Sequence, residues 1–434
     1  MAKKKLDYKK TFFIGFGFFA SSIAWSMYNT FVPQMLEKTF VPQIITSLGL
    51  EIGILTTLTG VIMTIDNVFG VVFQPLFGAL SDKTNTRIGR RMPYIAVGLP
   101  ISALLFAMIP LMPSLGLFMF VLILFNFVMS TWRAPVVALM PDLTPPSLRS
   151  QANGVINLMG GVGSMLAFVL GGMLIDLWSF APFFFSSLVM LLALVFLRIF
   201  VKEPAGSAAM ESQTPDNAEE QLSIGELPPA EKKLRVRSLI FLLLAIFFWF
   251  NGYNAVETLF SLYATEALDV SLGAASMMLA LFSITFVGMS IPAGLFANKI
   301  GRRNAILIGL VGVALIFPAL IFIRNATLVR IMLLIGGAFW ACVNINSLPM
   351  VLQLCAHKDI GKYTGYYYLF SFSASITAPI LAGALRDIVQ DYGSVFIYAG
   401  VAFVLALGCM LLVRHGDLPK PKQSATEILS EMDS

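Results

Sequence analysis

Three ionisable residues lie deep within long apolar stretches of this sequence. Asp66 lies in VIMTIDNVFG, Arg133 in VMSTWRAPVV and Glu257 in FNGYNAVETLFSLY. A charge in the middle of a bilayer costs about 2.5–3.5 kcal/mol on insertion scales. Each of these three residues is therefore a candidate for a functional role. We expect Asp66 and Glu257 to carry protons, and Arg133 and Glu257 to bind a polar ligand. The alternative for Asp66 and Arg133 is a purely structural ion pair between two helices.

Aromatic and amide side chains recur near these charges at spacings of about one helical turn. A ligand ring binds aromatic faces, and its hydroxyl groups bind amides and charged groups. The candidates of this kind are Trp25, Asn29, Asn126, Asn254, Trp340 and Asn344. The alternative is structural, because such a Trp often packs at the membrane interface and such an Asn often joins two helices.

A basic loop follows the second apolar stretch and has a counterpart in the second half of the chain. Both copies contain a glycine that permits close helix approach, then arginines at the end of a span. The residues we assign to gating here are Asp82, Arg87, Arg90, Arg91, Arg302 and Arg303. A simple anchor at the positively charged membrane face would explain the arginines, but not their repetition. Asp142, Asp176 and Asp387 fall at span ends and are expected to be interfacial caps or gate pairs.

The composition requires most of the chain to face lipid. Apolar residues make up 57% of the 434 residues and charged residues only 12%, against about 45–50% and about 25% in soluble domains. Three Cys and two His have no metal-type spacing, and no nucleotide-binding loop is present. We therefore expect no enzyme, no metal and no cofactor. The net charge of +5 belongs to loops, so we expect membrane lipids as partners and no nucleic acid.

Twelve apolar stretches are long enough to cross a bilayer, which needs about 20 residues per helix. They are 11–36, 53–81, 92–112, 114–143, 151–175, 179–200, 238–264, 271–297, 304–323, 328–355, 364–388 and 393–413. The sequence therefore predicts an all-α membrane protein of four parts: a six-helix bundle at 1–200, a polar linker at 201–237, a second bundle at 238–414 and a tail at 415–434. Lys and Arg gather on the side of the termini, the linker and the RIGRR and NKIGRR loops, so we expect both termini in the cytoplasm and the chain in the inner membrane.

The two bundles repeat each other in sequence. Gly89 corresponds to Gly301, the segment 152–159 to 363–370, and Asp176 to Asp387, at offsets of 211 or 212 residues. A near-constant offset across separate features indicates two parallel repeats with a site between them at mid-membrane.

Two motifs resemble a known transporter family. QPLFGALSD followed by TRIGRRMPYI, at residues 74–95, and ALMPDLTP followed by RSQANG, at 138–154, are similar to the glycoside–pentoside–hexuronide:cation symporters of the major facilitator superfamily. The Gln-Pro-Leu start and the double arginine resemble the branch related to sucrose/proton symporters. This resemblance implies the major facilitator fold and a sugar substrate coupled to a cation.

One departure from the family pattern affects the coupling chemistry. Melibiose-type members carry two carboxylates on the second helix, where this chain has Gly70 and Gln74. Sucrose-symporter relatives often have an Asp on the fourth helix, where this chain has Asn126. The resemblance therefore does not support a sodium site, and Asp66 is the nearest carboxylate.

These observations favour a monomeric secondary transporter that imports a di- or oligosaccharide or a glycoside together with protons. One alternative is an exporter or exchanger of a lipid-like or drug-like substrate, which predicts an apolar cavity. Another is a membrane sensor that transports nothing and shows no proton-linked uptake.

Overall fold

The computed structural model describes residues 6–49, 52–145, 148–203, 228–355 and 359–416. Within these ranges every regular element is a helix, and twelve spans are long and apolar enough to cross a membrane. The predicted tail, apart from 415–416, and residues 204–227 of the predicted linker lie outside the described residues.

The first six spans form the N-terminal bundle. The first span is continuous through a π-helical turn at Leu36–Phe40, and the second is interrupted at Thr64. The helices are α1 (Tyr8–Met35), α2 (Val41–Leu48), α3 (Leu55–Met63), α4 (Ile65–Lys83), α5 (Met92–Met108), α6 (Leu115–Leu143), α7 (Arg149–Leu177) and α8 (Ala181–Phe200).

The last six spans form the C-terminal bundle. They are α9 (Pro229–Ala267), α10 (Leu272–Ile300), α11 (Arg302–Ala319), α12 (Ala326–Leu352), α13 (Ile360–Val389) and α14 (Ser394–Leu411). Helix α9 begins at Pro229, inside the segment that the sequence assigns to the linker up to residue 237. Pro at the first helical position and the good helix formers of AEKKLRVR extend the helix beyond its apolar part.

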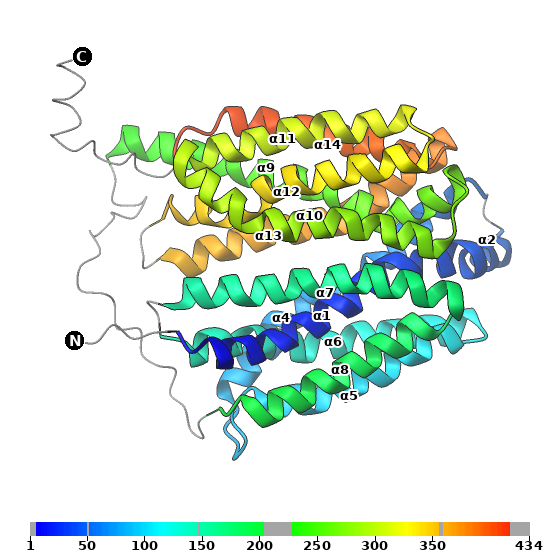
Figure 1. Cartoon of the computed structure of the whole chain (residues 1–434), viewed down its shortest axis with the longest axis horizontal. Coiled ribbons are helices and arrows are strands. Elements are labelled where there is room, and N and C mark those ends of the chain that lie inside the picture. Colours follow the sequence, from blue (N-terminus) through cyan, green and yellow to red (C-terminus); the bar gives the residue numbers. More distant parts are fainter. Residues whose placement is uncertain (1–5, 50–51, 146–147, 204–227, 356–358, 417–434) are drawn as a thin grey trace.

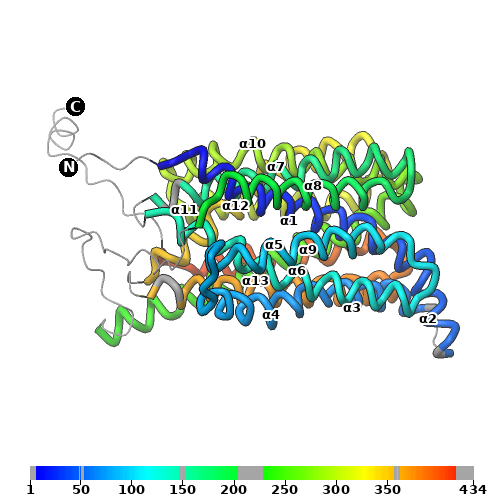
Figure 2. Tube along the Cα trace, turned by 90° about the horizontal axis from the view of Figure 1, so that it is seen from below, coloured from blue at the N-terminus to red at the C-terminus, as the bar shows by residue number. Residues whose placement is uncertain are grey.

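The two bundles lie side by side with their helices running in one general direction (Figure 1). The beginning of α1 and the end of α14 lie at one end, which we call the terminal face, and α2 lies at the other, the opposite face (Figure 2). Each bundle has its own apolar core. Across the boundary α7 contacts α10, α13 contacts α3 and α4, and α1 contacts α9. The contact of α7 with α10 and the contact of α13 with α3 and α4 are equivalent under the sequence repeat.

Candidate functional site

Asp66 lies where the second span is broken. Helix α3 ends at Met63, and Asp66 lies in the first turn of α4. A carboxylate oxygen of Asp66 accepts hydrogen bonds from the backbone N–H and the side-chain amide of Asn67, at 2.6 and 2.7 Å. A helix N-terminus favours an anion because its N–H groups and dipole point toward it. Asn67 therefore holds the Asp66 carboxyl group in place at mid-span.

Arg133, on α6, extends toward the boundary between the bundles. Its guanidinium carbon lies 5.6 Å from the centre of the Trp25 ring. It is within electrostatic range of Asp66 and of Tyr368 on α13, but it forms no direct ion pair with any residue that the structure describes. Its donors are therefore available to a ligand beside an aromatic face.

Glu257 approaches the same region from the other bundle. Its carboxyl interacts with Tyr253, one turn earlier on α9, and with Asn29 on α1. Asp66 lies within electrostatic range of it. The Tyr253 ring stacks on Trp340 of α12 at 4.6 Å between centroids, with only 1° between the planes. The aromatic pair therefore supports the side of α9 that carries Glu257.

Five predicted residues thus lie near one another in the middle of their spans, and we call this polar cluster the central chamber: Trp25, Asn29, Asp66, Arg133 and Glu257. All five side chains are partly exposed although they lie in the interior of their spans. The chamber combines two carboxyl groups, one guanidinium, one amide and one indole ring, contributed by both bundles.

The other predicted ligand residues are placed differently. Asn126 is buried and donates to the Tyr28 hydroxyl at 3.3 Å, and Trp340 is buried behind Tyr253. Asn254 donates to the Phe250 carbonyl of its own helix at 2.7 Å, and the Asn344 side chain is partly exposed on α12.

Sequence reasoning missed two tyrosines near the central chamber as site candidates. Tyr28 lies within electrostatic range of Asp66, and Tyr368 lies within electrostatic range of Arg133. The run of tyrosines at 366–368 in an apolar span was the one available signal. Tyr368 is nearer the terminal end of α13, faces a residue of the other bundle and is 48% exposed.

At the opposite face the boundary is closed by Asp387, at the end of α13. Its carboxylate accepts hydrogen bonds from the backbone N–H groups of Thr56 and Thr57, at 3.1 and 2.7 Å, and from the Thr57 hydroxyl at 2.6 Å. The N–H groups at a helix start have no partner in their own helix. Asp387 therefore caps α3 from the other bundle.

Asp176, the repeat-related residue at the end of α7, makes the reciprocal contact. Its carboxylate accepts from the Ser271 hydroxyl at 2.9 Å and from the Gly273 N–H at 3.2 Å, and so caps α10. The expectation that these carboxylates cap helix ends agrees with their geometry.

Glycines bring the backbones together beside both caps. A Cβ atom on Gly172 would lie 2.6 Å from the carbonyl oxygen of Gly273, and one on Gly383 would lie 2.5 Å from that of Thr56. Gly172 and Gly383 each precede a capping Asp by four residues and are themselves related by the repeat. The close approach therefore exists twice.

Further contacts join the bundles at this face. The Gln34 amide donates to the Thr265 hydroxyl at 2.9 Å, and Lys38 forms an ion pair with Glu266 at 3.2 Å. The buried Glu37 accepts from the Tyr392 hydroxyl.

At the terminal face the predicted gating residues form contacts within the N-terminal bundle. Arg90 and Arg91 both pair with Asp142 at the end of α6, at 2.6 and 2.9 Å, and Arg91 also pairs with Asp82. The Glu203 carboxylate accepts from the backbone N–H of Arg91 and so caps α5. Arg87 is exposed and forms no ion pair with a described residue.

The second copy of this loop uses carbonyl groups in place of carboxylates. Arg303 donates to the carbonyls of Val413 and Leu411 at the end of α14, at 2.6 and 3.0 Å, and Arg302 donates to that of Pro349 at 3.3 Å. Gly89 and Gly301 have positive φ of 106° and 94°, which only glycine adopts without strain. The loop backbone is therefore repeated even where its partners differ.

Two six-helix bundles with a polar chamber between them define a polytopic membrane transporter. The part of the chain that the structure describes contains no group of three or more His, Cys, Asp or Glu side chains placed to hold a metal ion. The sequence matches the Major Facilitator Superfamily over residues 14–271 and 258–431, so the chain belongs to that family and is not an enzyme.

Known proteins similar to this chain include drug-resistance proteins and a transporter of known structure. It is 25% identical over 329 residues to multidrug resistance protein 2 of Bacillus subtilis (strain 168), covering 75% of this chain and 80% of that one. It is 25% identical over 270 residues to the class H tetracycline resistance protein of Pasteurella multocida, covering 59% of this chain and only 61% of that relative. A bacterial homolog of the human lysosomal transporter Spinster, solved in an inward-facing and occupied conformation, has a TM-score of 0.67 at 12% identity, with 94% and 95% of the two chains covered. That likeness shows the fold alone.

Proposed function

We propose that this chain is a proton-coupled secondary transporter of a sugar or glycoside that works by alternating access. The observation that carries the proposal is the central chamber, where two carboxyl groups lie near the Arg133 guanidinium, which forms no ion pair with a residue that the structure describes. The motifs at residues 74–95 and 138–154, which resemble sugar:cation symporters, support the substrate class.

Asp66 and Glu257 are the proton carriers in this proposal. They lie on opposite bundles and within electrostatic range of each other. Like charges disfavour simultaneous ionisation, so a proton bound at one site is linked to the charge of the other. Substrate hydroxyls bound at Arg133 on one bundle and Glu257 on the other would favour closure of the bundles around the ligand, which is the differential binding that alternating access needs.

We also propose that the terminal face is cytoplasmic and that the structure faces inward. The basic loops lie at that face, and the bundles are joined at the opposite face. The lysines and arginines of the linker and the N-terminus follow the same bias.

The test is substrate-dependent alkalinisation of the medium by expressing cells, screened over a panel of sugars and glycosides. Asp66→Asn should abolish concentrative uptake while sparing exchange of labelled for unlabelled sugar, because only coupling needs the titratable proton. Asp269→Asn is the matched control, since Asp269 is exposed in the loop after α9 and has a positive φ of 52° that Asn tolerates. Normal accumulation in Asp66→Asn would remove Asp66 from the mechanism.

A second function, export of an apolar or drug-like compound by exchange with protons, is favoured by one observation. Glu257 borders a cavity lined mainly by aromatic and aliphatic side chains, and the relatives include drug-resistance proteins. Arg133→Gln separates the two functions. It should weaken sugar binding by about 10- to 100-fold, the value of a hydrogen bond to a buried charge, whereas transport of an apolar compound should persist.

A further inference from the structure

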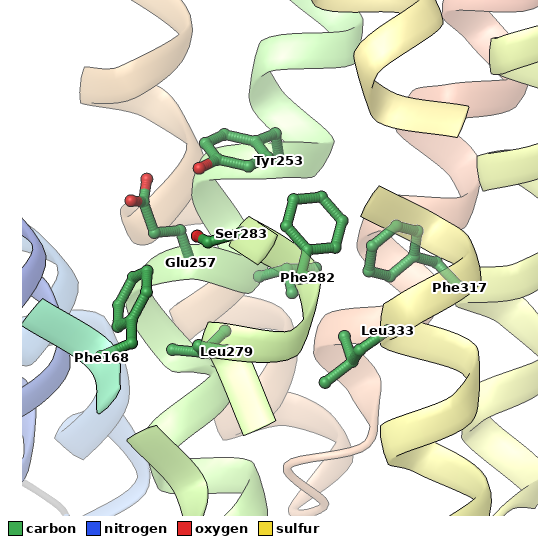
Figure 3. Close-up of a pocket in the computed structure, with 9 residues that line it drawn as sticks. Phe168, Tyr253, Glu257, Leu279, Phe282, Ser283, Phe317 and Leu333 are labelled. Carbon is green, nitrogen blue, oxygen red and sulfur yellow. The ribbon is translucent and has the colours of Figure 1, made fainter. Parts of the chain in front are cut away.

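A buried carboxyl group at the opposite face lies apart from the central chamber. Glu37 belongs to the π-helical turn Leu36–Phe40 of the first span and is 4% exposed. Such turns are rare and occur frequently at functional sites. In the chamber, the Glu257 carboxyl lies beside Tyr253 (Figure 3) and interacts with Asn29 of α1. Glu37 lies eight residues beyond Asn29, or about 12 Å along the span, so it is a separate site.

Glu37 joins the two bundles through hydroxyl groups. One of its carboxyl oxygens accepts a hydrogen bond from the hydroxyl of Tyr392, which lies between α13 and α14, and another from the Thr56 hydroxyl of α3 at 3.3 Å. Its other oxygen is buried and has no hydrogen-bond partner among the residues that the structure describes. An ionised carboxylate can accept several hydrogen bonds on each oxygen, so the charged form is poorly satisfied here.

The guanidinium closest to this carboxyl group pairs with a different carboxylate. Arg386 on α13 is within electrostatic range of Glu37, as is Asp387. The Arg386 guanidinium forms an ion pair with Asp387 at 3.1 Å and lies over the Tyr392 ring, 4.1 Å from its centre. Asp387 also accepts three hydrogen bonds from the start of α3. Asp387 is therefore the carboxylate that this site stabilises in its charged form.

The second cation near Glu37 is also paired elsewhere. Lys38, the next residue of the chain, forms an ion pair with Glu266 of α9 at 3.2 Å. Of Glu37, Asp387 and Glu266, only Glu37 forms no ion pair with a residue that the structure describes. A buried ion without a partner is far more costly than a neutral carboxyl group. Closure of the two bundles around Glu37 therefore favours its protonated form.

We infer that Glu37 is a proton-binding site of the closed boundary at the opposite face, which binds a proton when the bundles meet and releases it to the medium when they part. The site is additional to the proton carriers proposed in the central chamber. Water would stabilise the carboxylate in the open state, so the closed state binds the proton more tightly. Low pH therefore favours closure, and this advantage is lost as the pH rises. Over that range, the ratio of open to closed molecules should rise by up to about 10-fold per pH unit.

A distance measured across the opposite face tests this site without any substrate. Ser47 on α2 and Thr327 on α12 are exposed and lie one on each bundle. Spin labels at these two positions, after the three native cysteines are replaced by alanine, give the populations of short and long distances in nanodiscs by double electron–electron resonance. We expect the long-distance population to grow from mildly acid to mildly alkaline pH. Because no substrate is present, this result is independent of what the chamber transports.

Glu37→Gln mimics the protonated form and keeps an acceptor for Tyr392. It should hold the boundary closed and remove the pH dependence. Glu266→Gln is the matched control, since Glu266 joins the same bundles at the same face but its side chain is 44% exposed. This control and Asp66→Asn, a change in the chamber, should both retain the wild-type pH dependence. An equal pH dependence in Glu37→Gln and in the wild-type protein would overturn the inference.

Tyr392→Phe gives a second result that a purely structural contact would not produce. The Tyr392 hydroxyl donates to the Glu37 carboxyl and so stabilises its ionised form. Without this donor the closed state should bind the proton more tightly, and the opening transition should move to higher pH by about one unit. An unchanged transition, or one that moves to lower pH, would contradict proton binding at Glu37.

Discussion

The two faces of this molecule hold their helices together in different ways. At the opposite face, carboxylates and glycines join one bundle to the other, as Asp176 does for α10 and Asp387 for α3. At the terminal face, arginines join helices of the same bundle, as Arg91 does for α4 and α6 and Arg303 for α14. In the proposed alternating access, the contacts at the opposite face, which we call the gate, would have to separate, whereas those at the terminal face, which we call the braces, join helices of one bundle and would stay intact.

The sequence repeat makes this difference informative. Asp176 and Asp387 are related by the repeat, and each caps a helix of the other bundle with its carboxylate. The repeat-related arginines differ, because Arg91 pairs with carboxylates and Arg303 with carbonyl groups. Contacts between the two bundles are equivalent under the repeat, so both would break when the bundles separate. Contacts within one bundle would stay intact, so they have no need to be equivalent.

The largest effect should follow from removal of the strongest brace. Arg91 is 5% exposed and pairs with Asp142, which is 15% exposed. Arg91→Gln leaves that carboxylate partly unpaired in a shielded place, a loss of about 3 kcal/mol. We expect a lower thermal unfolding temperature in detergent and slower transport, with unchanged substrate affinity.

Lys83→Gln is the matched control for this brace, because Lys83 is exposed at the end of α4, beside the same loop. It should leave stability and transport unchanged. A large loss of substrate affinity in Arg91→Gln, with normal turnover, would contradict the role of a brace.

The next effect should come from opening the gate. Loss of one helix cap costs about 1 kcal/mol, so Asp176→Ala together with Asp387→Ala should shift the balance by about 2 kcal/mol toward the state open at the opposite face, roughly 30-fold. Thiol labelling of a cysteine introduced at Thr57 should accelerate in this variant. Asp176→Ala alone, or Asp387→Ala alone, should shift this balance by about half as much free energy as the double variant.

Asp391→Ala is the control for the caps. Asp391 lies at the same face but pairs with Arg324 of its own bundle at 2.6 Å. If the cysteine is labelled as fast in Asp391→Ala as in the double variant, loss of any charge loosens the opposite face. The distinction between contacts that join the bundles and contacts within one bundle would then be wrong.

An effect of similar size should follow when the backbones at the gate are forced apart. Gly383→Ala places a Cβ 2.5 Å from the Thr56 carbonyl oxygen, and overpacking of this kind costs about 1–3 kcal/mol. The closed gate should weaken, measured by the same labelling. Gly365→Ala, on the same helix with nothing within 4 Å of its Cβ, should have no effect. Equal labelling of the two variants would argue against close backbone contact at the gate.

The smallest effect concerns the exposed pair Arg324–Asp391. Burial acts to raise the pKa of Asp391, but the Gly393 N–H and the Arg324 guanidinium outweigh it and hold that pKa below its ordinary value. A depressed folded pKa stabilises the protein above the unfolded pKa, and the stabilisation is lost as the pH falls through the folded value. Asp391→Asn should therefore cost about 0.5 kcal/mol at neutral pH, as exposed pairs do, and nothing at strongly acid pH. A pH-independent difference in unfolding temperature would contradict this account.

The sequence alone was enough to predict twelve spans, the repeat, and the placement of the basic loops at the same face as the chain termini. Lipid imposes an apolar stretch of fixed length on every span, and this constraint is local, so it can be read along the chain. The same local signal predicted Asp66, Arg133 and Glu257 as site candidates, because a charge within an apolar span has few structural reasons to be there.

Tertiary structure decided which candidates share one chamber and what the carboxylates at the span ends do. Asn126 and Trp340 have the same residue types as Asn29 and Trp25 and also lie within apolar spans, yet they are buried within their bundles. A helix presents each side chain in a direction set by its rotation and crossing angle, and the sequence of one helix does not fix either. Likewise, the partners of Asp176 and Asp387 are N–H groups of distant helix starts. Only the docking of the two bundles brings those groups within hydrogen-bonding distance.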